Sequence, residues 1–164
     1  MTGVDAIRTA LQSTQQLITW FLSDLSDDDL LVRPAPGANH IAWQMGHFIV
    51  SETRLVTQPT FKVVYPELPA DFDKQHGAET NGREPATGFA TRAEYVDLFT
   101  KVRQATLAGL NGLKDSDLDT PTVGRMASFA PTLGALLLLT SNHSLMHAGQ
   151  FSVVRRKLGK PVLF

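Results

Sequence analysis

The chain has 164 residues, of which 43% are hydrophobic, and its formal net charge at pH 7 is −1. This length suits one globular domain, 1–164, that buries about 70% of the surface exposed by its unfolded chain. The near-neutral charge gives no reason to expect nucleic acid or an anionic membrane as a partner. Because the sequence has no cysteine, disulfides, thiolate metal ligands and a cysteine nucleophile are excluded.

Neither a signal peptide nor a membrane span is expected. The first residues, MTGVDAIRTA, lack the basic and apolar regions of a signal peptide. The longest uninterrupted apolar run, Ala135–Leu139, is far shorter than the about 20 residues that a transmembrane helix needs. We therefore expect a soluble, cytoplasmic protein.

The first predicted helix covers Val4–Leu25, where apolar residues recur at three- and four-residue spacing. Ser26 and Asp29 then resemble a capping box that starts a single helical turn. The run Arg33–Gly37, RPAPG, breaks the chain after this turn.

A second helix is predicted over His40–Val56, with Asn39 as its N-cap. On a wheel of about 100° per residue, three side chains share the face of His47: Trp43, Ser51 and Arg54. His40 lies two turns from His47, about 10 Å along the axis, so the two cannot ligate the same ion. We interpret His40 as a surface residue of the first turn.

Residues 59–90 form a connection rich in Pro and Gly, without helical periodicity. Such a length is unusual inside a compact domain. We expect a crossover that packs over one end of the bundle, or equally a lid. His76 lies in this segment, between Gln75 and Gly77, and is interpreted as solvent-exposed.

Two further helices complete the prediction. Thr91 and Glu94 form a capping box that opens a third helix, expected to run to about Leu113. After an irregular segment, Thr132–Gly159 reads as a helix of about seven turns, with a Thr start and a Gly stop. No segment shows the alternation of a strand. The predicted fold class is all-α, a four-helix bundle, in which metal sites lie between facing helices.

The last helix carries His143 and His147 within its apolar stripe. Residues four apart share one helix face, with Cβ atoms about 5–6 Å apart, so the two imidazoles can reach one metal ion at about 2.0–2.1 Å each. They can equally be hydrogen-bonded core histidines, and a third ligand from another element would decide. The candidate is His47, in mid-helix among apolar neighbours.

Two stretches of the chain resemble the DinB/YfiT-like family, whose members are regarded as metal-dependent enzymes. The first stretch, LSDDDLLVRPAPGANHIAWQMGHFIVSE, contains the pair Gly46–His47. The second, TLGALLLLTSNHSLMHAGQFSVVRRKLGKP, carries the pattern His143, His147, Gly149 and Gln150. Together these motifs are fairly specific, and the resemblance covers nearly the whole chain.

The resemblance implies a four-helix bundle with a long crossover between the second and third helices. It also implies a divalent metal ion, zinc or nickel, held by His47, His143 and His147, and low-molecular-weight thiols among the cosubstrates of the family. In many members a second histidine precedes the last ligand. Here Met146 takes that place, and it points about 100° away from its successor on the helix.

Three imidazoles with one open coordination position are typical of a catalytic metal site. Such a site can lower the pKa of a bound water or bind a thiol as thiolate. Gln150 is a candidate to orient the water or substrate, or else makes a helix–helix hydrogen bond. Arg54 is a candidate partner for a substrate carboxylate, or else a surface residue. Trp43 and Ser51 are further candidates beside the metal.

Competing metal classes are excluded, because the sequence contains neither Glu-x-x-His nor His-Glu-x-x-His. Two hypotheses remain. One is a metal-dependent transferase or hydrolase with a small-molecule substrate and a thiol cosubstrate, in a chain that forms a homodimer. The other is a non-catalytic metal-binding bundle that acts as a binding or stress-response protein. The open coordination position favours the enzyme, whereas Glu52, about 140° from His47 on the wheel, is no well-placed general base.

Overall fold

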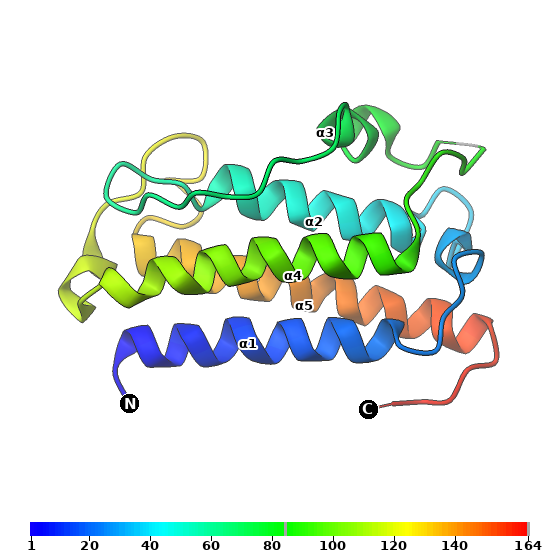
Figure 1. Cartoon of the computed structure of the whole chain (residues 1–164), viewed down its shortest axis with the longest axis horizontal. Helices are drawn as coiled ribbons and strands as arrows, with labels where there is room; N and C mark the ends of the chain where they lie inside the picture. Colours follow the sequence, from blue (N-terminus) through cyan, green and yellow to red (C-terminus); the bar gives the residue numbers. More distant parts are fainter. Residues whose placement is uncertain (84, 164) are drawn as a thin grey trace.

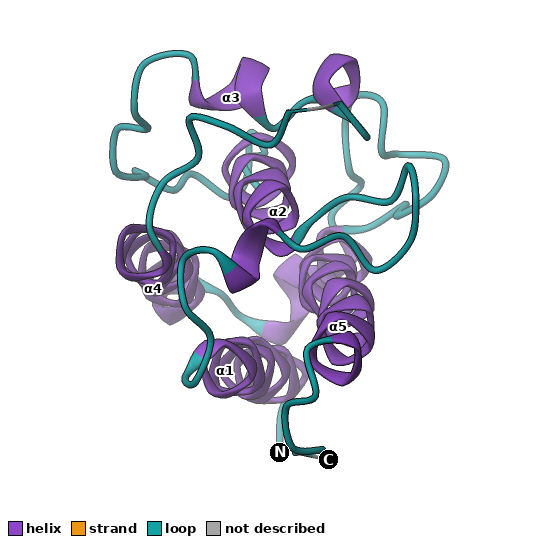
Figure 2. Cartoon of the chain, turned by 90° about the vertical axis from the view of Figure 1, so that its right-hand side faces the viewer, coloured by secondary structure: helices purple, strands orange, loops and turns teal. Residues whose placement is uncertain are grey.

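The structure, a computed structural model, describes residues 1–83 and 85–163. Four long helices dominate it: α1 (Gly3–Leu22), α2 (Ile41–Leu55), α4 (Arg92–Gly109) and α5 (Leu133–Lys157). Seen end-on in Figure 2, they form a bundle in which each helix packs against two others. The described part of the chain contains two isolated bridges and no strand. The predicted all-α, four-helix architecture is confirmed.

Short elements connect the long helices. A one-turn helix, α3 (Phe72–Gln75), lies over the outer side of α2 (Figure 2). The other short elements are single 3₁₀ turns: η1 (Asp29–Leu31), η2 (Ala78–Thr80), η3 (Leu110–Gly112) and η4 (Asp115–Asp119). Among the described helices, none combines the length and the apolar character that crossing a membrane requires.

The direction of the helices explains the long crossover. In Figure 1, α1 and α5 run one way and α2 and α4 run the other way. Because consecutive long helices α2 and α4 are parallel, the segment between them returns along the length of the bundle before α4 begins. The crossover between the second and third helices is therefore confirmed, but it lies along the outside of α2 rather than over one end of the bundle as expected.

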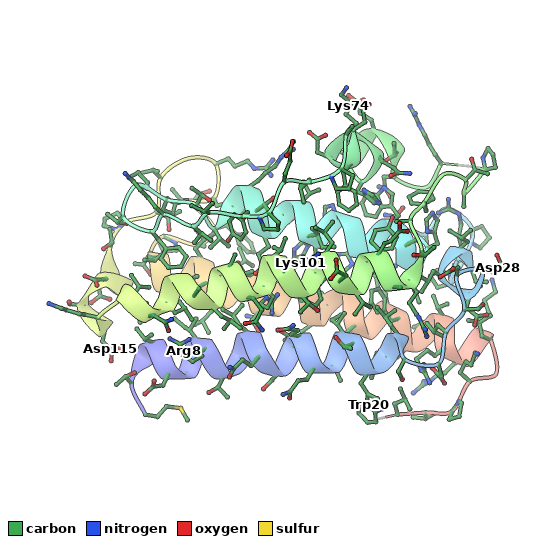
Figure 3. The ribbon with its side chains drawn as sticks, in the orientation of Figure 1. Arg8, Trp20, Asp28, Lys74, Lys101 and Asp115 are labelled. Atoms are coloured by element: carbon green, nitrogen blue, oxygen red, sulfur yellow. The ribbon has the colours of Figure 1, made fainter. Side chains whose placement is uncertain are left out.

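Side-chain caps fix several of the helix starts. The predicted capping box of α4 is present, since Thr91 Oγ1 accepts from the Glu94 N–H and the Glu94 carboxylate accepts from the Thr91 N–H at 2.8 Å. A second box, at Thr2, opens α1. There the Asp115 carboxylate also accepts the first two backbone N–H groups of the helix, each at 3.0 Å (Figure 3). These contacts satisfy donors that a helix start leaves unpaired.

The predicted cap of the second helix is wrong by one residue. His40 is the N-cap, and its Nδ1 accepts the Trp43 backbone N–H at 3.1 Å. Asn39 instead accepts the Gly82 N–H on its side-chain oxygen. The interpretation of His40 as a surface residue is also wrong, because its ring is 1% exposed and packs edge-on against Phe89. Capping turns the imidazole inward, under the crossover.

Two of the predicted helix ends also differ. The first helix ends at Leu22 rather than Leu25. The third ends at Gly109 rather than Leu113, because the chain tightens there into the 3₁₀ turn η3.

Arg103 of α4 and Glu52 of α2 form an ion pair in the middle of the bundle, with side chains 0% and 1% exposed. The contact is bidentate, with N···O distances of 3.0 Å and 2.9 Å. The guanidinium also donates to the other two helices: to the Leu11 carbonyl and Thr14 on α1, and to Ser144 on α5. Thr106 donates to the carboxylate at 2.6 Å. One side chain thus joins all four helices.

The crossover is anchored to α2 through His76, which is 1% exposed. Its interpretation as a solvent-exposed loop residue is therefore wrong. The ring lies directly against Gly46, where an added Cβ would stand 2.1 Å from the imidazole. His76 Nε2 accepts from the Tyr95 hydroxyl at 2.7 Å, and its Nδ1–H donates to the Phe72 carbonyl at 2.7 Å. Gly46 is thus required because a histidine from the crossover fills the place of a side chain.

We expect Arg103→Leu alone to lower the free energy of unfolding by about 3–5 kcal/mol, since it leaves the Glu52 carboxylate buried without a counter-charge. The double variant Glu52→Leu/Arg103→Leu should recover most of that loss, because no charge remains in the core. Urea unfolding of the two single variants and the double variant measures the coupling. Equal and additive losses would show that the pair does not act as a unit.

Gly46→Ala should destabilise the fold by about 1–3 kcal/mol, because the new methyl group collides with the His76 ring. Gly149→Ala is the matched control. Gly149 also lies within a helix, but nothing stands within 4 Å of its would-be Cβ, so alanine should stabilise the helix by about 0.5–1 kcal/mol. Thermal unfolding of both variants tests the contrast. Equal behaviour of the two would contradict the close approach of the crossover to α2.

Candidate metal centre

Three histidines from two facing helices meet on the side of the bundle that the crossover covers. His47 lies in the middle of α2, and His143 and His147 lie one turn apart on α5. One ring nitrogen from each residue lies within 4.8 Å of the other two. The His47 ring centroid is 5.2 Å from that of His143 and 5.5 Å from that of His147. The structure therefore brings together the three residues that the sequence singled out.

A hydrogen-bonded chain fixes the orientation of His147. Its Nδ1–H donates to Gln44 Oε1 at 2.8 Å, and the Gln44 amide nitrogen donates to the Asn39 carbonyl at 2.7 Å. Because the amide oxygen can only accept, the proton of the neutral ring lies on Nδ1. Nε2 of His147 therefore carries a lone pair, and it points to His143 Nε2 at 3.2 Å.

His47 is held in a similar way from the crossover. Its Nδ1 lies 3.4 Å from the backbone carbonyl of His76. Because the carbonyl can only accept a hydrogen bond, the ring proton lies on Nδ1 and Nε2 of His47 carries a lone pair. The Trp43 indole stacks on the same ring, with centroids 4.7 Å apart and planes 11° apart. The indole N–H in turn donates to Thr80 Oγ1 at 2.9 Å. The crossover thus sets the tautomer of His47 through the His76 carbonyl, and Trp43, held by Thr80 of the crossover, sets the plane of the ring.

All three imidazoles are neutral at ordinary pH. Burial, together with the neighbouring His143 and His47, lowers the pKa of His147 to about 3. Burial and the neighbouring His47 lower the pKa of His143 to about 4. Burial also lowers the pKa of His47, against the opposing effect of its bond to the His76 carbonyl. A histidine ligates metal in its neutral form, so the rings are in the state that coordination requires.

The donor set fits a divalent metal ion. Tetrahedral ligands at about 2.0–2.1 Å from zinc lie about 3.3–3.4 Å from one another, close to the 3.2 Å between the Nε2 atoms of His143 and His147. Outer-shell acceptors on the second ring nitrogen, such as Gln44 Oε1 and the His76 carbonyl, are typical of metal-binding histidines. Three nitrogen ligands also leave a coordination position for a further ligand.

The other sequence candidates divide into near and distant residues. Trp43 contacts His47 directly, and Ser51, one turn further along α2, lines a cavity beside His143. Arg54 is a surface residue that pairs with Asp73 of the crossover. Gln150 is exposed, and within the described residues no hydrogen bond joins it to another helix.

Sequence reasoning missed the residues that support the three rings. Gln44 is a lone amide in the apolar run IAWQMGHFIV, and this position is the sequence signal that could have revealed a buried polar partner. In the structure Gln44 is 0% exposed. The Gly46–His47 pair is visible in the sequence, but the sequence does not indicate why position 46 requires a glycine. The partner that requires it, His76, comes from a segment without periodicity, so no local pattern indicated it.

Comparison with known proteins gives a family and a fold. The family model of the DinB superfamily matches residues 10–151. A conserved protein from Enterococcus faecalis is similar in structure, with a TM-score of 0.70, 17% identity, and coverage of 98% of this chain and 99% of that chain. A DinB-like protein from Bacillus cereus has a TM-score of 0.63 and 21% identity, over 94% and 91% of the two chains.

A third similar structure is YfiT from Bacillus subtilis, described as a probable metal-dependent hydrolase with an unusual four-helix bundle topology. It has a TM-score of 0.69 and 15% identity, over 96% of this chain and 89% of that chain. The curated proteins contain no match. Since the family model covers most of the bundle, from α1 to α5, this chain belongs to the DinB superfamily.

Proposed function

We propose that this protein is a metal-dependent enzyme, a transferase or hydrolase, whose zinc or nickel ion is held by His47, His143 and His147. The observation that carries the proposal is the convergence of three neutral imidazoles, with ring nitrogens within 4.8 Å, from two rigid helices. The description of the structurally similar YfiT as a probable metal-dependent hydrolase supports it.

When bound, the metal ion supplies a Lewis acid that lowers the pKa of a water molecule or a thiol at its open position. The chain supplies the positions of the ligands. Gln44 and the His76 carbonyl hold two rings in one tautomer each, and Phe48, whose ring centroid lies 5.6 Å from that of His147, excludes water from one side. Such fixed ligands need no reorganisation when a substrate binds.

The side chains near the site favour chemistry at the metal over acid–base catalysis by a carboxylate. Glu52 is the carboxylate nearest in sequence to His47, and both of its oxygens are bonded to Arg103 or Thr106. It is therefore not available as a general base. Since the chain has no cysteine, a reaction with sulfur uses a thiol that enters as cosubstrate. A low-molecular-weight thiol is the cosubstrate that we propose.

We expect the purified protein to bind about one divalent metal ion per chain. His47→Ala, His143→Ala and His147→Ala should each weaken zinc binding more than about 100-fold, because a ligand is lost. Gln44→Leu removes only the support of His147 and should cost about 10–100-fold. Isothermal titration of the metal-free variants with zinc measures the series.

His40→Asn is the control for this series. Asparagine keeps an N-cap acceptor for α2, and His40 is not one of the three converging histidines, so zinc affinity should not change. Circular dichroism checks that every variant remains helical. Full zinc affinity in His147→Ala would show that the proposed ligand set is wrong.

The buried histidines also predict how the metal-free protein responds to acid. A histidine whose folded-state pKa is depressed stays neutral in the folded protein, whereas the same histidine takes up a proton in the unfolded chain. The pKa of His143 is lowered from 6.5 to about 4. Between pH 6.5 and about pH 4, His143 is therefore neutral in the folded protein and protonated in the unfolded chain. The free energy of unfolding should therefore fall as pH is lowered from about 6.5 to about 5.

Urea unfolding of the metal-free protein at several pH values within that window tests this expectation. His143→Gln should have a shallower pH dependence, reduced by up to about one proton. A wild-type stability that is flat or rises on acidification would contradict the burial of neutral imidazoles.

A further inference from the structure

A cavity of about 250 Å³ opens beside His143, between α2, α5 and the segment that precedes α5. Each element contributes apolar side chains to its wall: Phe48 and Leu55 from α2, Leu136, Leu139 and Met146 from α5, and Met126 and Phe129 from the segment 120–132. His143 belongs both to this wall and to the cluster of three histidines. The cavity therefore borders the proposed metal site at His143.

The wall carries no uncompensated carboxylate. Glu52 contributes to it, but the Arg103 guanidinium and the Thr106 hydroxyl already satisfy its oxygens. Apart from His143, the other polar contributions are the hydroxyls of Ser51 and Thr140, and that of Thr140 donates to its own helix at the Leu136 carbonyl. A charged group placed here would lose its hydration without gaining a partner, whereas an apolar group gains by leaving water.

Phe129 stands at this cavity with its side chain 74% exposed. It belongs to a compact turn in which the Phe129 N–H and the Ala130 N–H both donate to the Met126 carbonyl. Met146, which also lines the cavity, is 64% exposed. Together the two side chains form an exposed apolar rim of the cavity, and exposed apolar patches of this kind mark ligand-binding grooves. An aromatic ligand group in the cavity would cover part of the Phe129 ring.

We propose that this cavity binds the apolar part of the substrate, an uncharged aryl or branched alkyl group, while the polar reacting atom lies at the three histidines. Only the placement of the polar reacting atom rests on the proposed metal site; the binding of the apolar group to the cavity does not. An engineered apolar cavity of about 150 Å³ accommodates benzene, so a cavity of about 250 Å³ has room for a substituted ring.

A larger cavity does not fit this role. It measures about 420 Å³ and lies between α1, α5 and the C-terminal residues 161–163, and none of the three histidines lines it. A molecule bound there would be separated from the proposed metal site by the body of α5.

The binding of two hydroxamic acids to the zinc-loaded protein tests the proposal. Acetohydroxamic acid and phenylacetohydroxamic acid offer the same metal-binding group, and only the second has a ring for the cavity. We expect the phenyl compound to bind at least about tenfold more tightly, as burial of an aromatic ring predicts. Isothermal titration gives both affinities.

A second measurement does not use the metal. Fluorobenzene added to the chelator-treated protein should bind in the cavity, as seen by ¹⁹F NMR line broadening. Leu139→Trp fills the cavity from α5 and Met126→Trp fills it from the opposite wall, and each should abolish both fluorobenzene binding and the preference for the phenyl hydroxamate. Leu138→Trp is the matched control, because Leu138 is 43% exposed and does not line the cavity.

The outcomes separate this inference from the proposed function. Equal binding of the two hydroxamates, with no binding of fluorobenzene, would overturn the cavity and leave the metal site intact. If neither hydroxamate binds, but fluorobenzene binds to the wild type and not to Leu139→Trp or Met126→Trp, the metal site is overturned and the cavity is supported. Loss of the phenyl preference in Leu138→Trp as well would overturn the assignment of the preference to this cavity.

Discussion

Arg103 and Glu52 place two opposite charges in the apolar middle of the bundle, and the arrangement of the helices depends on keeping them together. Removing both groups from water is costly, and their attraction offsets that cost only when the geometry is good. Here the guanidinium has acceptors on α1, α2 and α5 at once. A shift of one helix by a turn would leave a buried charge without its partner, so the pair penalises every other register of the bundle.

The same pair determines where the histidines meet. On α5, Ser144 accepts a hydrogen bond from the Arg103 guanidinium and directly follows His143. On α2, Glu52 lies five residues after His47. The two helices that carry the imidazoles are therefore tied at neighbouring positions to one fixed side chain. Gln44 and the crossover then set the rings themselves. The site combines a rigid frame from the ion pair with orientation from Gln44 and from His76 of the crossover.

The sequence predicted whatever depended on local spacing. The capping box at Thr91 follows from residues within one turn, and the shared face of His143 and His147 follows from helical geometry alone. His40 and His76 were misjudged because their surroundings come from distant parts of the chain. Phe89 covers the first, and the missing side chain of Gly46 makes room for the second. Phe89 follows His40 by 49 residues and Gly46 precedes His76 by 30 residues, so local spacing could not reveal either contact.

The pairing of α1 with α5 has a consequence for the making of the protein. These helices pack against each other, yet residues 23–132 separate them in the chain. A ribosome adds about 5–20 residues per second, so the apolar stripe of α1 waits for seconds to tens of seconds before its largest partner has been synthesised. Two of the three histidines arrive on that last helix. The bundle therefore closes and gains its candidate metal site only after α5 has been synthesised, and a nascent chain paused before α5 would have an exposed stripe and no site.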